Sequence, residues 1–295
     1  MGQVERPGLL RRRAQAKMAA REDLMWAPRF RWITRVLGIP VRVRLPFGSW
    51  WVAENDACGR AILRDRFENA ERCFVEKYLQ PGMTVLDIGA HHGFYTLLAA
   101  QKVGPGGRVI AFEPSPRERE KLFRHLRLNG CTNVQVESLA LGGREGLAEL
   151  FVVNGKETGC NSLRPPQVPQ PTEVLEVPVG RLDSYLERQR VPGVDFIKMD
   201  VEGAELEVLR GAAELLGRRP RPVILCEVQD ARTQPWGYAA KEIVEFLRGF
   251  GYRWFQPVPE GGLRPLSAEQ AEFDGNFVAV PEERLEQVRK MGPAV

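Results

Sequence analysis

The sequence predicts an α/β protein in which helices cover both faces of a parallel β-sheet. Short runs of continuously apolar residues alternate with longer segments that have the apolar spacing of helices, as in successive βαβ units. The chain has 295 residues, of which 43% are hydrophobic and 27% are charged. It is therefore long enough to bury a sizeable core in one large domain or two small ones.

Two elements precede this alternation. Alternating side chains over 41–53, with a turn at Phe47-Gly48, predict a β-hairpin. Apolar residues at helical spacing predict a helix over 66–79, which ends at Pro81-Gly82.

The alternating elements then follow in order. Short apolar runs predict strands at 84–88, 108–112, 134–137, 195–199, 222–227, 252–256 and 276–280. Helical spacing predicts helices at 94–102, 116–128, 204–216 and 238–250. The glycine-rich segment 104–107 ends the first of these helices, and Asn129-Gly130 ends the second.

The alternation is interrupted between about 142 and 182. Strands at 147–153 and 174–179 are expected to be antiparallel, and 154–173 between them is rich in Pro, Gly and polar residues. This segment is either a surface loop or, as we favour, a lid or substrate surface beside the carboxyl edge of the sheet. Its G-C-N-S-L group is either plain loop or a substrate contact.

The net charge of +4 is unevenly distributed along the chain. Residues 1–44 contain eleven Arg or Lys and three Asp or Glu, a balance of +8, so the remainder carries −4. The basic leader is either a solvated tail or a surface for an acidic partner such as anionic lipid, nucleic acid or a polyanionic carrier. Within it, 26–37 mixes Arg with Trp, Phe and Leu and is either an interfacial helix or a strap packed on the domain.

Cysteine and histidine usage indicates neither a disulfide framework nor a metal site. The five cysteines are scattered, odd in number and without C-x-x-C spacing, so a reducing cytoplasm is the expected compartment. His91 and His92 are adjacent and have no third ligand nearby, so no metal is expected. His125 falls in the polar pattern of a helix and is expected at the surface. No apolar run approaches the roughly 18 residues of a membrane span, and no signal peptide is indicated.

The stretch VLDIGAHHGFY at 85–95 joins a predicted strand to a predicted helix. In open α/β sheets, ligands bind outside the carboxyl ends of the strands. Gly89 and Gly93 remove side chains where the backbone bends and a ligand approaches, and the start of the helix presents free amides to an anionic group. Asp87 would repel a pyrophosphate but would suit an ammonium group. The spacing D-x-G-x-x-x-G also differs from the dinucleotide pattern G-x-G-x-x-G.

The stretch VIAFEPSP at 109–116 adds a second acidic position. Glu113 follows the next strand, 24 residues beyond Gly89, where an acidic group can accept both hydroxyls of a ribose. The two stretches therefore suit a ligand with an amino acid at one end and a ribose at the other. S-adenosylmethionine has that shape.

At these residues the sequence resembles the class I S-adenosylmethionine-dependent methyltransferases, and within them the FkbM family. The resemblance extends over roughly 60–285, and IKMDVEGAE is its most distinctive part. It is carried by VLDIGAHHGFYTLLAA (85–100), VIAFEPSP (109–116), LALGGREG (139–146), DFIKMDVEGAELEVLRGA (195–212), VILCEV (223–228) and GNFVAVP (275–281). The resemblance implies a Rossmann-like, doubly wound, mostly parallel sheet of seven strands with an antiparallel last strand.

The resemblance also implies which residues bind the cofactor, S-adenosylmethionine. The residues expected at the methionine end are Asp87, Gly89, Ala90, His91, Gly93, Tyr95 and Thr96. Glu113 and Pro114 would hold the ribose, and Ser138 and Leu139 would lie near the adenine. The family usually has Asn where His91 stands, and imidazole can still donate a hydrogen bond there. Phe67-Glu68 either reaches the cofactor or is a packing residue with a solvated neighbour.

The strand at 195–199 delivers acidic side chains to the same edge of the sheet. A hydroxyl acceptor must lose its proton, so a positioned carboxylate or imidazole would assist methyl transfer. The candidate bases are Glu202, Asp200, His92 and Glu227. Asp200 can instead contact the cofactor, which would leave Glu202 as the better base. Lys198 either orients these carboxylates or is a buried strand residue, and Glu205 is expected to cap the next helix or form a salt bridge.

The leading hypothesis is an O-methyltransferase acting on a hydroxyl of a sugar, glycolipid or natural product, a substrate class that the resemblance supplies. A nucleic-acid methyltransferase is the second hypothesis, but base N-methylation typically uses N-P-P-Y or D-P-P-Y where this chain has D-V-E-G. A non-catalytic ligand-binding role is the third, and the acidic edge argues against it. A nicotinamide dehydrogenase is disfavoured by Asp87 and by the missing G-x-G-x-x-G spacing.

The predicted organisation has three parts. A basic extension with a hairpin covers 1–58, a methyltransferase domain with the insert covers 59–285, and a tail covers 286–295. We expect a cytoplasmic protein whose basic leader is either free or in peripheral contact with a membrane or an anionic carrier.

Overall fold

The computed structural model describes residues 37–267, 270 and 272–291. The chain divides into two compact units, the first ending at Phe67 and the second beginning at Glu68. The predictions for the basic leader, including most of 26–37, fall outside the described residues.

The first unit contains the predicted hairpin. Strand β1 (Val41–Arg44) pairs antiparallel with β2 (Trp50–Ala53), and the Arg42 guanidinium lies 4.3 Å from the centroid of the Trp50 ring. A short helix that the sequence pattern did not predict, α3 (Ala57–Ile62), follows the hairpin. It begins where the Asp56 side chain accepts a hydrogen bond from the Gly59 amide at 2.7 Å.

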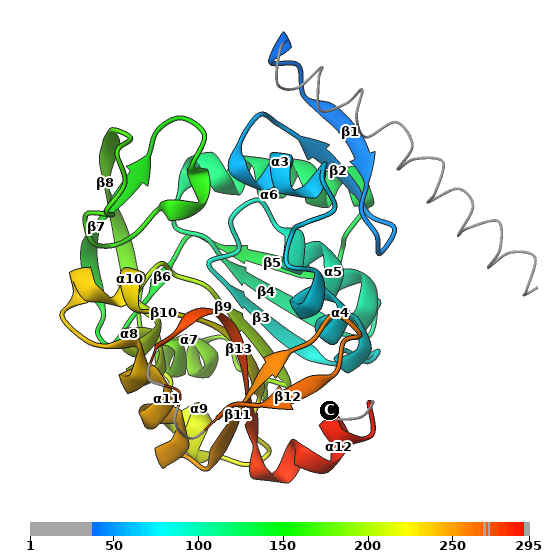
Figure 1. Cartoon of the computed structure of the whole chain (residues 1–295), viewed down its shortest axis with the longest axis vertical. Coiled ribbons are helices and arrows are strands. Elements are labelled where there is room, and N and C mark those ends of the chain that lie inside the picture. Colours follow the sequence, from blue (N-terminus) through cyan, green and yellow to red (C-terminus); the bar gives the residue numbers. More distant parts are fainter. Residues whose placement is uncertain (1–36, 268–269, 271, 292–295) are drawn as a thin grey trace, which may run out of the picture. The chain divides into compact units, whose positions relative to one another are not determined.

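The second unit is built on the predicted doubly wound, mostly parallel sheet (Figure 1). The spatial order of its strands is β12 (Leu263–Pro265), β11 (Tyr252–Pro257), β13 (Asp274–Pro281), β10 (Val223–Gln229), β9 (Phe196–Met199), β3 (Thr84–Ile88), β4 (Arg108–Phe112) and β5 (Val134–Glu137). The last strand, β13, is antiparallel to both of its neighbours, as expected. The expected number of seven strands is wrong by one, because β12 has only three residues and is too short to give a strand pattern.

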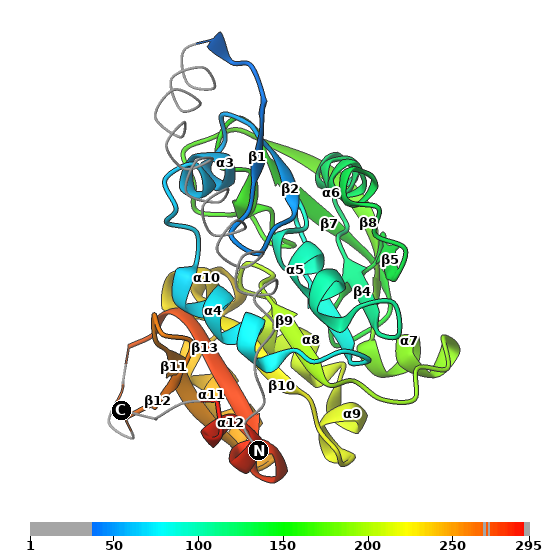
Figure 2. The same ribbon diagram turned by 90° about the vertical axis from the view of Figure 1, so that its right-hand side faces the viewer.

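Helices pack on both faces of this sheet. Figure 2 shows α4 and α5 on one side and α8 and α9 on the other. The helices of this unit are α4 (Asn69–Tyr78), α5 (Phe94–Val103), α6 (Pro116–Asn129), α7 (Leu182–Arg188), α8 (Glu205–Arg210), α9 (Ala213–Gly217), α10 (Asp230–Thr233), α11 (Ala240–Gly249) and α12 (Leu285–Arg289). Among the described residues, no helix combines the length and the apolar character needed to cross a membrane.

Alternate residues of β9 show how the two faces are filled. Ile197 and Met199 belong to the large core cluster under α7, α8, α9 and α11. Phe196 points to the other face, where its ring lies 5.6 Å from that of Tyr78 on α4. Lys198 lies on the same face as Phe196. A buried cationic side chain therefore lies near the carboxyl edge of the sheet.

The predicted single helix over 204–216 is wrong, because the structure divides it into α8 and α9. The break lies at Gly211-Ala212. Asp183 causes it from another element, since its two carboxylate oxygens accept hydrogen bonds from the Glu214 and Leu215 amides at 2.9 and 3.0 Å. These contacts start a new helix at its first turn.

The insert forms a separate three-stranded sheet in the order β6 (Ala140–Leu141), β8 (Thr172–Gly180) and β7 (Gly146–Val153). The predicted antiparallel pairing of β7 and β8 is confirmed. A small apolar cluster of its own includes Leu150, Val152 and Val177. Between the two long strands lies a single 3-10 turn, η2 (Thr158–Cys160).

Candidate active site

The carboxyl ends of four neighbouring strands bring the predicted acidic residues to one edge of the sheet. Asp87 lies in β3, Glu113 follows β4, Asp200 follows β9 and Glu227 lies near the end of β10. Strands β4, β3, β9 and β10 are consecutive in the sheet and mutually parallel. Residues far apart in sequence therefore meet where open α/β sheets bind ligands.

The turn between β3 and α5 is held in left-handed backbone conformations. Gly89, His91 and Gly93 have φ of +80°, +49° and +89°. Histidine is among the residues that tolerate this conformation better than most, as Asn also does, which explains how it can stand where the similar family has Asn.

Both glycines of this turn are also required by packing within the protein. A β-carbon on Gly89 would lie 1.8 Å from the Asp200 carbonyl oxygen, and one on Gly93 would lie 2.3 Å from Leu122 Cδ1. The turn is therefore locked against the exit of β9 and against α6. This adds a second reason for glycine to the one expected from ligand approach.

Glu113 is buried beside this turn. Its Oε2 accepts a hydrogen bond from the His91 amide at 2.8 Å, and its Oε1 accepts one from the Ser115 amide at 2.9 Å. Burial raises the pKa of Glu113, and the two hydrogen bonds lower it. Burial has the larger effect, so the pKa is about 7. Each oxygen still has acceptor capacity, so the carboxylate can receive the two hydroxyls of a ribose.

Asp87 and Tyr95 form the other side of the turn. The Thr96 hydroxyl donates a hydrogen bond to Asp87, whose pKa burial raises to about 6. The Tyr95 hydroxyl donates to Glu68 Oε2 at 2.6 Å, and its ring lies 5.3 Å from Lys198 Nζ. The structure thus brings Glu68 next to the predicted cofactor residues.

The remaining predicted cofactor residues occupy neighbouring turns. The Ala90 amide donates a hydrogen bond to the Phe112 carbonyl oxygen at 3.0 Å. The Pro114 carbonyl accepts a hydrogen bond from Arg119 Nη1 at 2.6 Å. Ser138 and Leu139 directly follow β5, with Ser138 exposed and Leu139 packed on the large core.

Three carboxylates gather on the acidic side of the edge. The oxygens of Asp200, Glu202 and Glu227 lie within 4.8 Å of one another, a spacing that metal ligands also adopt. Two cations already oppose their charge. Lys198 Nζ lies 3.1 Å from Asp200 Oδ2, and Arg232 Nε lies 2.8 Å from Glu202 Oε2 as an ion pair without hydrogen-bond geometry.

The pKa values reflect this crowding. Burial, followed by repulsion from Asp200, raises the pKa of Glu202 to about 8 and raises that of Glu227 well above its usual range. Glu202 also has a left-handed backbone, with φ of +54°. Glu205 stands apart from this group because its Oε1 accepts hydrogen bonds from the Val201 and Gly203 amides, the capping role expected of it.

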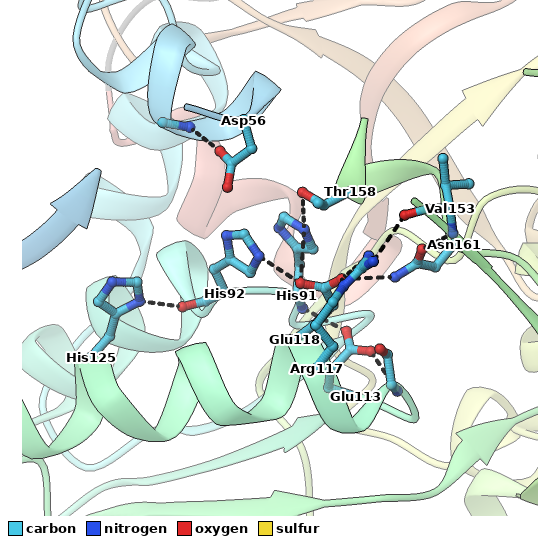
Figure 3. Close-up of polar contacts among 12 residues, drawn as sticks. Asp56, His91, His92, Glu113, Arg117, Glu118, His125, Val153, Thr158 and Asn161 are labelled. Carbon is cyan, nitrogen blue, oxygen red and sulfur yellow. Dashed lines mark hydrogen bonds and ion pairs between the residues drawn. The ribbon is translucent and has the colours of Figure 1, made fainter. Parts of the chain in front are cut away.

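His92 contacts α6. Its Nε2 lies 2.6 Å from Glu118 Oε2, and its ring stacks on that of His91 at 3.6 Å (Figure 3). Burial would raise the pKa of Glu118, but His92, His91 and Arg117 together lower it to about 2. His92 is therefore part of a buried charged network.

The expectation that His125 lies at the surface is wrong. Its side chain is fully buried, and Nδ1 lies 2.8 Å from the His92 carbonyl oxygen (Figure 3). The buried face of α6 consists of Glu118, Leu122, His125 and Leu126. Two polar residues thus share the inward stripe with two leucines, and this mixture hides the periodicity.

Two residues of the candidate site were not predicted from the sequence. Glu118 resembles an ordinary acidic residue in the first turn of a helix, and Arg232 lies in a four-residue helix without a motif. In the structure their partners, His92 and Glu202, reveal them. A signal for Glu118 is present in its spacing of four and eight residues from the buried leucines of α6.

Comparison with known proteins adds a family match. A model described as the methyltransferase FkbM domain matches residues 87–254. The 31-O-demethyl-FK506 methyltransferase FkbM of Streptomyces tacrolimicus is 28% identical over 71% of this chain and 88% of that protein. The 2-O-methyltransferase NoeI of Sinorhizobium fredii is 27% identical over 58% of this chain and 73% of that protein.

Two solved structures show similarity at lower identity. Methyltransferase FkbM from Methylobacillus flagellatus is 16% identical with a TM-score of 0.44, covering 76% of this chain and 53% of that chain. An O-methyltransferase from Bacillus cereus, solved in complex with SAH, is 16% identical with a TM-score of 0.44, covering 73% of this chain and 82% of that chain.

Proposed function

The chain belongs to the FkbM methyltransferase family, and from that premise we propose that it methylates a hydroxyl oxygen of a sugar, glycolipid or natural product. The observation that carries the proposal is the shared edge of the sheet. Buried acids suited to a ribose and an ammonium group lie on the β3 and β4 side, and carboxylates suited to proton removal lie on the β9 and β10 side.

The residues on this edge fit S-adenosylmethionine, the family's cofactor. Glu113 keeps acceptor capacity on both oxygens, and Asp87 offers a carboxylate beside the turn. Glu113 and Pro114 would hold the ribose, with Ser138 and Leu139 at the adenine. The group of residues that would hold the methionine end is Asp87, Gly89, Ala90, His91, Gly93, Tyr95 and Thr96. When bound, this cofactor supplies a methyl carbon on a sulfonium that is a good leaving group.

Glu202 is the residue to which we assign the general base. A base works best when its pKa is near the operating pH, and burial beside Asp200 raises the pKa of Glu202 to about 8. Arg232 keeps this carboxylate in place at 2.8 Å. Glu202 in its ionised form would accept the proton of the acceptor hydroxyl.

The other candidate bases are weaker. Asp200 Oδ2 is already paired with Lys198 Nζ at 3.1 Å. His92 has its Nε2 committed to Glu118 at 2.6 Å. Glu227 remains an alternative, since its buried Oε2 has no hydrogen-bond partner among the described residues.

The choice of a hydroxyl acceptor is supported by relatives. The names of the two proteins similar to this chain specify 31-O and 2-O methylation. A nucleic-acid acceptor is favoured by the basic leader alone, and D-V-E-G at 200–203 differs from the loops of base N-methyltransferases. We also propose a cytoplasmic location, with the basic leader either a solvated tail or in peripheral contact with a membrane or anionic carrier.

Calorimetry with S-adenosylmethionine, its demethylated product S-adenosylhomocysteine and NAD tests the cofactor. The first two should bind and NAD should not, and binding of NAD alone would overturn the proposal. Transfer of labelled methyl from S-adenosylmethionine to a panel of sugars, glycolipids, macrolides and RNA then tests the acceptor. Label confined to RNA would favour the alternative.

A further inference from the structure

The tip of the insert, residues 158–162, contacts both halves of the site. Two of its side chains, those of Thr158 and Ser162, are buried. The tip is fixed to its own strand, because Ser162 and Phe151 exchange backbone hydrogen bonds at 2.9 and 3.2 Å. Asn161 Oδ1 also accepts a hydrogen bond from the Val153 amide at 2.9 Å. The tip is thus an ordered part of the insert.

One end of the tip reaches the cofactor turn. Thr158 Oγ1 lies 3.2 Å from His91 Nε2 (Figure 3). His91 is the residue whose amide donates to Glu113 at 2.8 Å, from a left-handed backbone with φ of +49°. A contact that fixes the His91 side chain helps to keep this unfavourable backbone conformation, and with it the amide that orients Glu113.

The middle of the tip is attached to α6. Asn161 Nδ2 donates to Glu118 Oε1 at 3.2 Å, and Arg117 Nη1 donates to the Val153 carbonyl at 3.0 Å (Figure 3). Glu118 is the buried acid that also holds His92. The insert and the cofactor turn therefore share one polar network.

The other end of the tip reaches the acceptor side. The Ser162 hydroxyl donates to the Glu202 carbonyl oxygen at 2.8 Å. Glu202 has a left-handed backbone with φ of +54°, so this contact holds a strained residue in place. Beside it, Arg232 Nη2 lies 3.6 Å from Cys160 Sγ.

We propose that Thr158 and Ser162 are positioning residues that orient Glu113, through His91, and Glu202, so that the insert sets both cofactor affinity and acceptor geometry. This inference rests on the proposed function, because it takes Glu113 to be the ribose acceptor and Glu202 to be the base. Thr158 and Ser162 themselves need touch neither cofactor nor acceptor.

Calorimetry with S-adenosylhomocysteine on the full chain tests the Thr158 half. Thr158→Val keeps the shape but removes the hydroxyl, and it should raise the Kd about three- to tenfold, the usual effect of one lost hydrogen bond. Thr158→Ser keeps the hydroxyl and should remain within about twofold of wild type. Gly159→Ala is the matched control in the same tip, since a β-carbon there meets nothing within 4 Å.

Alkylation of Cys160, followed by peptide mass spectrometry, gives a second readout. S-adenosylhomocysteine should slow this alkylation in wild type and in Thr158→Ser. The effect should be smaller in Thr158→Val, because this variant lacks the hydroxyl that connects the tip to His91 in the cofactor turn. Equal unfolding temperatures of the variants would exclude general destabilisation.

The Ser162 half is tested with the acceptor that the methyl-transfer panel yields. Ser162→Ala should lower kcat with little change in KM, and Ser162→Thr should restore it. If wild type and Thr158→Val bind S-adenosylhomocysteine equally well, this inference alone is overturned. Wild type that binds none overturns the proposed function and this inference with it.

Discussion

Gly89 and Asp200 are packed so closely that a β-carbon on the glycine would lie 1.8 Å from the aspartate carbonyl oxygen. The turn after β3 and the exit of β9 are therefore one packing unit. Gly82 has nearly the same backbone, with φ of +87° against +80°, yet a β-carbon there meets nothing within 4 Å. A comparison of substitutions at Gly82 and Gly89 therefore distinguishes backbone strain from steric overlap.

We predict that Gly82→Ala costs about 1–2 kcal/mol of unfolding free energy, from its left-handed conformation alone. Gly89→Ala should cost about 1–3 kcal/mol more, because overpacking adds to the same strain. Denaturant unfolding of the two variants measures the difference. Equal losses of unfolding free energy would show that the turn after β3 can move away from the exit of β9 at little cost.

Glu113→Ala should abolish measurable binding of S-adenosylhomocysteine while the fold remains intact. The variant removes both oxygens that would accept the ribose hydroxyls, and calorimetry together with circular dichroism checks the two parts of this expectation. Glu120→Ala, an exposed acid on α6, is the control and should bind normally. Unchanged affinity in Glu113→Ala would count against the ribose assignment.

The same carboxylate should make cofactor binding depend on pH. Burial raises the pKa of Glu113 to about 7, and the ionised form is the better acceptor of two hydroxyls, because protonation replaces one acceptor site by a donor. Affinity for S-adenosylhomocysteine should therefore fall as the pH drops below 7, approaching about tenfold per pH unit. Calorimetry at pH 8, 7 and 6 measures this, and affinity that rises on acidification would contradict it.

Glu118→Gln should weaken the fold by about 3 kcal/mol, because it breaks a buried charged pair. The pKa of Glu118 is lowered to about 2, below its ordinary value of 4.5. The ionised carboxylate thus stabilises the fold above about pH 4.5, and this contribution is lost as the pH falls toward 2.

Acid unfolding followed by circular dichroism should accordingly show a shallower pH dependence in Glu118→Gln than in wild type. Glu145→Gln is the matched control, because its partner Arg188 and Glu145 itself are 54% and 50% exposed. Its loss should be small, because exposed ion pairs contribute little to stability. A Glu118 variant as stable as this control would refute the buried pair's role.

Glu202→Gln should lower kcat about 10²–10⁴-fold with the acceptor that the panel identifies, while affinity for S-adenosylhomocysteine is retained. In wild type, kcat should rise as the pH passes through about 8, since the base must be ionised. Glu207→Gln removes a neighbouring surface acid paired with Arg210 and should leave kcat unchanged. A pH profile that persists in Glu202→Gln would assign the base elsewhere.

The strands that carry the site were predictable, since β3 and β4 begin and end at the predicted residues. Their apolar runs are continuous because both faces are buried. The break between α8 and α9 was not predictable, because Asp183, which causes it, lies on another element. Local spacing carries no information about such a partner.

The candidate site shows the same division. Asp87, Glu113 and Glu202 could be selected because they follow or end strands, a position visible in the sequence. Arg232 could not, and Glu118 had only its spacing from the buried leucines of α6 as a signal, since the importance of both comes from contacts across the fold. Polar residues buried on a helix face, like His125, are invisible to an amphipathic pattern that assigns them to solvent.

The short strand β12 has a consequence for how this molecule behaves at high concentration. It occupies one rim of the eight-stranded sheet with only three residues, the last of which is Pro265. An edge strand this short, which ends in a residue without an amide hydrogen, is a poor template for pairing with a second molecule. On that side the protein is guarded against intermolecular sheet growth and the aggregation that follows from it.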